Sequence, residues 1–273
     1  KPELASETSA LSEQSVVTEV GYEDRIVRLQ ASPVGVDVDY IETLAQSEAT
    51  EARLREIKAE LGEGQLILSV GRTDYTKGGI EQLQSFERLL ENRPDLRGKL
   101  RLMHVSVAAN SSMTAYEEIQ RDLEHLAGKI NGRYGSFDWQ PIALISRPVP
   151  FHDLVAYYRA ADVAWITPLA DGMNLVCKEY CAARTDEDGV LVLSEFAGAA
   201  VELAAAVPTN PFSYKSMDGA IQFALDLPKE ERRARMISNR KMVRLQDIRY
   251  WAEDQMRAFG DEGLAVDIAD DAA

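Results

Sequence analysis

Two cations stand in a short turn bounded by glycines, and their spacing suits the binding of a diphosphate. Arg72 and Lys77 lie between Gly71 and Gly78, directly before a segment with a helical pattern. A helix N-terminus offers unpaired backbone N–H groups and a partial positive charge, so an anion is stabilised there. Arginine can bind two phosphate oxygens at once, while lysine acts as a point charge. An ordinary surface loop with two solvated cations explains the segment equally well, and the P-loop pattern is absent.

A second candidate site is the turn that begins at Asp171 and the helix that follows it. Gly172 permits a tight turn, and the backbone N–H groups behind it would face a phosphate or a sugar. These groups belong to Met173, Asn174, Leu175 and Val176. Glu179, one turn into the helix, would accept hydrogen bonds from ribose hydroxyls. The alternative is structural, because Asp171 or Asn174 can cap the helix and a lone carboxylate on a helix is usually solvated.

The elements that must position these residues follow a regular order. Short apolar runs typical of buried strands alternate with amphipathic helical patterns, which predicts a Rossmann-like parallel α/β sheet with helices on both faces. The predicted strands are 66–70, 100–107, 142–145, 163–166 and 190–193, and the predicted helices between them are 78–92, 112–130, 151–160 and 174–184. Ligands bind at the carboxyl ends of such strands. Both turns, and the small-residue segment 194–198, follow strands and are therefore expected at one edge.

The flanking segments carry further elements. We expect a strand at 26–31 and a helix at 38–61 before the sheet, then helices at 198–205 and 214–227. The charged segment 228–259 is also predicted to be helical, and an acidic tail follows it.

Composition excludes several classes of function. The 273 residues include 45 acidic and 30 basic side chains, a formal charge of −15, which argues against a nucleic-acid partner. The two cysteines, Cys177 and Cys181, have no further cysteine or histidine cluster beside them, so we expect no metal site and a reducing compartment. The first residues are polar, and no apolar run approaches the roughly 18 residues that span a membrane. These observations predict a soluble cytoplasmic protein without a membrane partner.

Six motifs together resemble family 20 of the retaining glycosyltransferases, whose members include trehalose-6-phosphate synthases and glucosylglycerol-phosphate synthases. The motifs are Arg72–Gly78 (RTDYTKG), Ile130–Gly135 (INGRYG), Asp138–Trp139, Thr167–Leu175 (TPLADGMNL), Lys178–Tyr180 (KEY) and Leu193–Gly198 (LSEFAG). The match covers about residues 20–255.

That family has the two-domain GT-B architecture, in which Rossmann-like domains face each other across a cleft. This chain resembles only the end of the first domain and all of the second. The resemblance implies that 1–35 is a remnant of the N-terminal acceptor domain, 36–240 is the nucleotide-sugar-binding domain, and 241–273 is a C-terminal helix with an acidic tail. We expect this stretch alone to be inactive, because the opposing domain supplies much of the acceptor site.

The resemblance also implies roles for individual residues. Arg72 and Lys77 would hold the donor diphosphate and stabilise the negative charge that develops on it as it departs. Asp171 would contact the glucose hydroxyls. The other donor contacts would come from Gly172, Met173, Asn174, Leu175, Val176 and Glu179, with Val149 and Leu154 beside the base. No metal or other cofactor is expected, because the cationic residues neutralise the diphosphate.

Two departures from the family pattern concern the substrates. Trehalose-6-phosphate synthases carry an arginine that grips the phosphate of glucose 6-phosphate, where this chain has Asn110 in its acceptor loop. The loss of that guanidinium removes a charged hydrogen bond worth about 1.5–3 kcal/mol. The arginine that usually precedes the Asp-Gly pair is Ala170 here, which bears on the donor base. The acceptor loop and Trp165–Pro168 look more like the members that use glycerol 3-phosphate and often ADP-glucose.

We therefore expect an enzyme that moves glucose from a nucleotide diphosphate glucose, with ADP-glucose favoured, to glycerol 3-phosphate for compatible-solute synthesis. Two alternatives remain open. One is a trehalose-6-phosphate synthase, whose acceptor is glucose 6-phosphate. The other is a non-catalytic nucleotide-sugar-binding module. The sequence leaves open the donor base, the regulation, and whether the protein is a monomer or a homo-oligomer.

Overall fold

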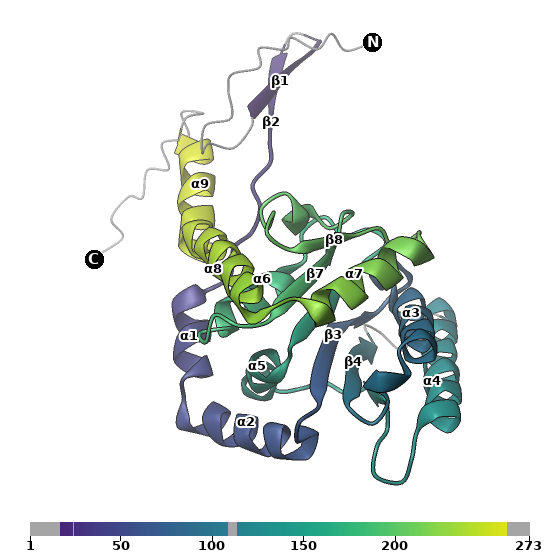
Figure 1. The fold of residues 1–273 in the computed structure, drawn as a ribbon. Helices are drawn as coiled ribbons and strands as arrows, with labels where there is room; N and C mark the ends of the chain where they lie inside the picture. The colour runs from purple at the N-terminus through teal and green to yellow at the C-terminus, as the bar shows by residue number, and fades with distance from the viewer. Residues whose placement is uncertain (1–16, 24, 109–113, 261–273) are drawn as a thin grey trace, which may run out of the picture.

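A six-stranded, fully parallel sheet forms the centre of the computed structural model, which describes residues 17–23, 25–108 and 114–260 (Figure 1). The strands lie in the order β5-β4-β3-β6-β7-β8. Their bounds are β3 Gln65–Thr73, β4 Leu100–Ala108, β5 Ile142–Ile145, β6 Val163–Ile166, β7 Val190–Ser194 and β8 Val207–Thr209. The order reverses direction between β3 and β6, which is where doubly wound sheets bind their ligands.

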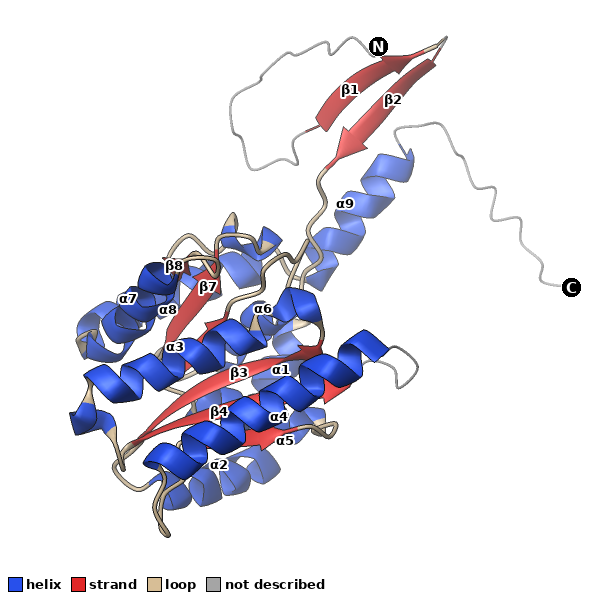
Figure 2. Ribbon diagram, turned by 90° about the vertical axis from the view of Figure 1, so that its right-hand side faces the viewer, coloured by secondary structure: helices blue, strands red, loops and turns tan. Residues whose placement is uncertain are grey.

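Helices cover both faces of this sheet (Figure 2). One face packs against α3 (Gly79–Asn92), α4 (Thr114–Tyr134) and α7 (Tyr214–Asp226). The other packs against α1 (Val38–Ala45), α2 (Glu48–Leu61), α5 (Phe151–Ala160), α6 (Leu175–Ala183) and α8 (Lys229–Leu245). Alternate strand residues enter the two hydrophobic clusters, as with Ile67 on the first face and Leu66 on the second. Burial on both faces explains why the strands are continuous apolar runs, and the predicted fold class is confirmed.

The predicted elements match the structure closely in the sheet and less well outside it. The predicted helix 38–61 is two helices, because the Ser47 hydroxyl accepts a hydrogen bond from Thr50 N and starts a new helix at residue 48. The segment 228–259 is likewise divided, because Asp247 caps α9 (Ile248–Gly260) by accepting from Arg249 N and Tyr250 N. The predicted helix 198–205 is wrong: only a 3₁₀ turn, Gly198–Ala200, forms there. Strand β8 was not predicted.

A two-stranded antiparallel hairpin projects from this body (Figures 1 and 2). It consists of β1 (Val17–Tyr22) and β2 (Arg25–Gln30), so the expected strand at 26–31 exists and has a partner. Asp254 of α9 accepts hydrogen bonds from Gln30 and Ser32 at 2.9 Å each. The hairpin is thereby tied to the last helix rather than to the sheet. The three-part domain division remains a prediction.

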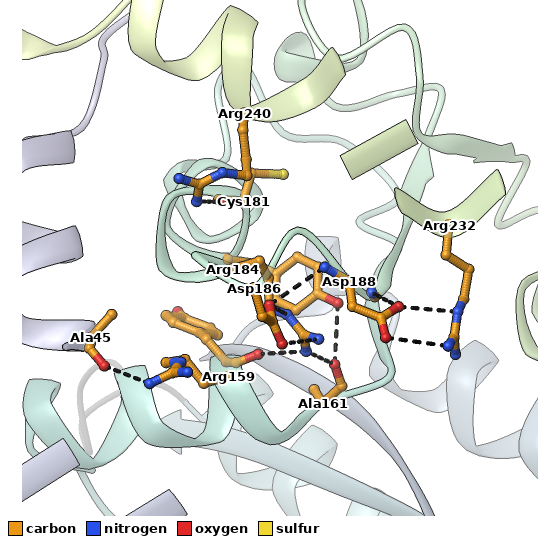
Figure 3. Close-up of polar contacts among 12 residues, drawn as sticks. Ala45, Arg159, Ala161, Cys181, Arg184, Asp186, Asp188, Arg232 and Arg240 are labelled. Atoms are coloured by element: carbon orange, nitrogen blue, oxygen red, sulfur yellow. Dashed lines mark hydrogen bonds and ion pairs between the residues drawn. The ribbon is translucent and has the colours of Figure 1, made fainter. Parts of the chain in front are cut away.

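Charged side chains lie at the edge at which the strands begin, and one of them, Arg184, is buried (Figure 3). The Arg184 guanidinium, between α6 and β7, binds both carboxylate oxygens of Asp186 at 2.9 and 3.0 Å and donates to the carbonyl oxygens of Tyr158 and Ala161. Asp188 pairs with Arg232 of α8 at 3.1 Å. These contacts join α5, α6 and α8, so this amino edge of the sheet serves the fold.

Within the described part of the chain, no helix combines the length and the apolar character that crossing a membrane requires.

Candidate functional site

Three loops meet at the opposite edge, where the strands end. They are the turn after β3, which contains a 3₁₀ helix (η1, Tyr75–Lys77), the loop after β6, and the loop after β7. Leu169 N donates to Thr76 O at 2.7 Å, which joins the first loop to the second. Gly198 N donates to Asp171 O at 2.8 Å, which joins the second to the third. The two turns singled out in the sequence therefore form one continuous surface.

Two glycines make this close approach geometrically feasible. Gly78 has φ +68°, a left-handed conformation, and a Cβ there would lie 2.2 Å from the carbonyl oxygen of Thr167. A Cβ at Gly198 would lie 2.1 Å from the carbonyl oxygen of Gly172. Both distances are to backbone atoms, which cannot rotate away. The glycines thus allow the three loops to touch.

The two predicted cations behave differently. Lys77 Nζ lies 2.8 Å from Asp171 Oδ2, so the cation turn and the Asp171 turn are joined by an ion pair. Burial alone would raise the pKa of Asp171, but hydrogen bonds from Lys77, Met173 N and Asn174 together hold that pKa below its ordinary value. Arg72 is exposed and has no polar partner among the residues that the structure describes. The Arg72 guanidinium is therefore free to bind a ligand, whereas the Lys77 ammonium is already paired with Asp171.

The N-terminus of α6 is capped from an unusual backbone conformation. Asn174 has φ +70°, which is uncommon and costly for a residue with a side chain. Its Oδ1 accepts from Cys177 N at 3.1 Å, while its Nδ2 donates to Asp171 Oδ2, also at 3.1 Å. Asn174 can therefore cap α6 while other N–H groups of the same helix end bind a ligand. The cap uses Cys177 N, and the backbone N–H groups of Leu175 and Val176 keep no partner within the described ranges.

Glu179 lies one turn further into α6, next to this helix end. Burial raises the pKa of its carboxyl group, and a hydrogen bond from Tyr158 Oη to Glu179 Oε2, 2.8 Å long, lowers it in part. Val149 and Leu154, at the start of α5, are half-buried and pack on the cluster beneath α5 and α6. The structure thus shows a packing contact for these two side chains. Their contact with a base remains a prediction.

A small pocket opens beside the cation turn, between the ends of β3 and β4. Its lining residues are Ser69, Val70, Gly71, Arg72, Asp74, Lys77, Gly79, His104, Val105, Ser106, Ile119 and Leu123. Burial lowers the pKa of His104 to about 4, which keeps its ring neutral. Thr73 Oγ1 lies 2.8 Å from Ser106 Oγ and donates to Gln120 of α4 at 2.9 Å. These hydrogen-bonded side chains were not among the predicted site residues, although the strand alternation places Thr73 and Ser106 on one face of the sheet.

Two further predictions concern the acceptor loop and a metal site. Asn110 of the acceptor loop lies outside the described residues. No three histidine, cysteine, aspartate or glutamate side chains come close enough to hold a metal ion in the described ranges.

A doubly wound parallel sheet with an uncapped pair of N–H groups, two cations and a half-buried carboxylate at its switch point places this chain in the class of Rossmann-like α/β proteins. The family is more specific than this class. Residues 4–261 match the model of glycosyltransferase family 20, and the chain belongs to that family.

Relatives of this chain fall into two groups of synthases. It is 44% identical over 249 residues to the glucosylglycerol-phosphate synthase of Synechocystis sp., covering 91% of this chain and 50% of that protein. It is 38% identical over 255 residues to the trehalose-6-phosphate synthase of Mycobacterium avium, covering 93% and 52%. The chain spans about half the length of the curated relatives it matches.

Solved structures agree with the fold. An α,α-trehalose-phosphate synthase (UDP-forming) from Burkholderia xenovorans, in complex with glucose-6-phosphate, superposes with a TM-score of 0.85 at 40% identity, over 89% of this chain and 54% of that one. The E. coli trehalose-6-phosphate structure bound with UDP-2-fluoro glucose gives 0.84 at 35%, over 89% and 55%.

Proposed function

We propose that the full-length protein is a retaining glucosyltransferase that moves glucose from a nucleotide diphosphate glucose to glycerol 3-phosphate. ADP-glucose is the favoured donor, and the product is glucosylglycerol phosphate, a compatible-solute precursor. The observation that carries the donor half is the ion pair between Lys77 and Asp171, because it brings the cation turn against the N-terminus of α6. The structure bound with UDP-2-fluoro glucose belongs to the same family of folds, which supports a nucleotide-sugar donor.

In this proposal each described group acts on a different part of the donor. The diphosphate accepts hydrogen bonds from the free N–H groups of Leu175 and Val176, at the positive end of the helix dipole. The open Arg72 and the Lys77 ammonium neutralise the charge that develops on the departing diphosphate. Asp171, already beside Lys77, takes the glucose hydroxyls. Glu179 takes the ribose.

The bond changes follow from this arrangement. The acceptor hydroxyl attacks the anomeric carbon from the face on which the diphosphate leaves, so the anomeric configuration is retained. The C–O bond to the diphosphate breaks, and the electron pair goes to the diphosphate oxygen. The proton of the attacking hydroxyl passes to that oxygen. Because the developing charge lies beside Arg72 and Lys77, their stabilisation is larger in the transition state than in the bound donor.

The acceptor rests on sequence features. Asn110 replaces an arginine of the trehalose-6-phosphate synthases, and a glucosylglycerol-phosphate synthase is among the relatives with 44% identity. Glucose 6-phosphate is the second candidate acceptor, since a solved relative holds it. A cytoplasmic location belongs to the proposal as well, since Cys177 and Cys181 are both free thiols that suit a reducing compartment.

One assay decides between the two acceptors. The full-length protein is incubated with ADP-, UDP- or GDP-glucose, and glycerol 3-phosphate or glucose 6-phosphate is offered separately. We expect release of the nucleoside diphosphate with glycerol 3-phosphate, fastest from ADP-glucose. Robust turnover with glucose 6-phosphate alone would make the protein a trehalose-6-phosphate synthase. Binding of the donor without turnover of either acceptor would make it a binding module.

The donor site has its own test, which does not depend on the acceptor. We expect the double variant Arg72→Ala, Lys77→Ala to bind ADP at least tenfold more weakly in calorimetric titration, because each charged hydrogen bond contributes about 1.5–3 kcal/mol. The matched control is Arg55→Ala, Lys58→Ala near the end of α2, two exposed cations at the edge where β3 begins, which removes the same charge. Equal affinities for ADP in the two double variants would refute the assignment of the diphosphate to the cation turn.

A further inference from the structure

The buried hydroxyl of Tyr158 ends at the candidate donor site. Tyr158 belongs to α5 and is 1% exposed, and its Oη donates to Glu179 Oε2 at 2.8 Å. Its ring packs edge-on against the ring of Tyr180, with centroids 6.3 Å apart, and its own carbonyl oxygen is bound by Arg184. The ring is therefore fixed on several sides. The hydroxyl makes no other hydrogen bond with the described residues.

Glu179 has few other contacts. A carboxylate can accept about four hydrogen bonds, yet among the described residues only Tyr158 donates to it. The charged groups on the elements packed around α6 are engaged elsewhere. Glu42 of α1 pairs with Arg240 and Arg244 of α8, while Lys178 pairs with Glu202 behind the 3₁₀ turn. Within the described ranges, no cation pairs with Glu179.

We infer that Tyr158 is a positioning residue for donor recognition, whose hydroxyl orients the Glu179 carboxylate toward the ribose hydroxyls of the nucleotide. This inference rests on the proposed function, in which Glu179 binds ribose. Tyr158 itself is buried beneath Glu179 and acts through it. With one side of Oε2 occupied by the hydroxyl, the remaining lone pairs of the carboxylate are those left open to a ligand.

Two physical effects follow from one hydrogen bond. The bond fixes the side-chain rotamer of Glu179, so binding of the ribose orders less of the protein. It also stabilises the ionised carboxylate, which only accepts hydrogen bonds, over the protonated acid. Tyr158 thus orients Glu179 and opposes the effect of burial on its pKa.

The test removes only the hydroxyl. In the full-length protein, Tyr158→Phe should raise the KM for the nucleotide sugar about three- to tenfold, the range expected for one hydrogen bond, with kcat nearly unchanged. Loss of the hydrogen bond raises the pKa of Glu179 further, so the acidic limb of 1/KM should move to higher pH. Wild type should be inhibited by ADP more strongly than by 2′-deoxy-ADP, and this ratio should shrink in the variant.

Tyr180→Phe is the matched control. Tyr180 is equally buried, and its hydroxyl donates to Ala161 O at 3.2 Å instead of to Glu179. Both variants lose one buried hydroxyl, so a merely structural role predicts the same kinetics for both. The inference predicts that only Tyr158→Phe changes the KM, the pH profile and the 2′-deoxy ratio.

The outcomes separate the inference from the function beneath it. If Glu179→Gln weakens donor binding and Tyr158→Phe behaves like Tyr180→Phe, the inference is overturned and the proposed function stands. If wild type transfers no glucose from any nucleotide sugar, the proposed function fails and the inference fails with it. If Tyr158→Phe alone shifts the KM and its pH dependence, the positioning role is established.

Discussion

The two edges of the central sheet use the same kinds of side chain for opposite purposes. At the amino edge, Arg184 is 5% exposed, and its guanidinium donates hydrogen bonds to a carboxylate and to two backbone carbonyl oxygens (Figure 3). At the carboxyl edge, Arg72 is exposed and has no polar partner in the described chain. Satisfied charges indicate a structural edge, and open ones indicate a binding edge.

The largest effect is expected at the structural edge. Arg184→Met should lower the free energy of unfolding by about 3–5 kcal/mol, because it removes the charged hydrogen bonds to Asp186 and leaves the buried carbonyl oxygen of Tyr158 without this donor. Denaturant unfolding measures this loss. At saturating donor, the specific activity of the folded fraction should change little, since Arg184 reaches the candidate site only through the backbone carbonyl of Tyr158.

Arg244→Met is the control for that substitution. Arg244 also forms two ion pairs, with Asp39 and Glu42, but its side chain is 51% exposed. Solvent-exposed pairs contribute about 0–1 kcal/mol. Equal destabilisation by the two substitutions would show that burial does not distinguish the amino edge, and the comparison would lose its physical basis.

The second prediction concerns the contact between two loops of the binding edge. Gly78→Ala should cost about 2–4 kcal/mol, from left-handed strain together with the clash with Thr167 O. The matched control is Gly98→Ala, where φ is +81° and no atom lies within 4 Å, so only the strain applies. The difference between the two unfolding free energies isolates the close approach.

The kcat/KM values of Gly78→Ala and Gly98→Ala test the contact between the loops in a second way. Gly78 precedes α3 directly after Lys77, so the clash should displace Lys77 from Asp171 and reduce kcat/KM about tenfold or more. Gly98→Ala should leave kcat/KM unchanged. A Gly78→Ala enzyme with normal kcat/KM would mean that the contact between these loops does not position the cation.

The features that the sequence predicts depend on local residue patterns. Those that it does not predict depend on a single side chain or on contacts between residues far apart in the chain. The strand runs and the order of turns could be predicted, because burial on two faces leaves a continuous apolar signal. Strand β8 could not, since its three residues carry too little pattern, and the break at Ser47 depends on one side chain acting as a cap. The ion pair between Lys77 and Asp171 joins residues 94 positions apart, and no local pattern encodes it.

Tyr158 shows the same limit within the site. Its position in a helical pattern indicates only a core residue, which it is. The hydrogen bond to Glu179 arises from the packing of α5 on α6, 21 positions later in the chain. The motifs therefore indicate candidate site residues, whereas a side chain that acts through packing, such as Tyr158, carries no motif.

The smallest expected effect is the change in stability when Glu179 is replaced, and the sign of this change separates a binding role from a structural one. Burial raises the pKa of Glu179, so the folded state binds its proton more tightly than the unfolded state. The stability that this tighter proton binding contributes is fully present below pH 4.5, the ordinary pKa of a glutamate. It is lost as pH rises through the pKa of Glu179 in the folded protein. Glu179→Gln cannot ionise and should be more stable than wild type at neutral pH, on the order of 1 kcal/mol. The advantage should vanish at low pH.

Glu202→Gln provides the contrast, since that carboxylate pairs with the buried Lys178 at 2.7 Å and its neutralisation should destabilise the protein instead. Thermal unfolding across pH measures both variants. Addition of ADP should then stabilise wild type more than Glu179→Gln, since a ligand stabilises in proportion to its affinity for the folded state. If Glu179→Gln is less stable than wild type at neutral pH, Glu179 is a structural carboxylate, and the binding edge includes one fewer open charge. If it is more stable and binds ADP less well, the unbalanced charge of Glu179 reduces stability and serves the ligand.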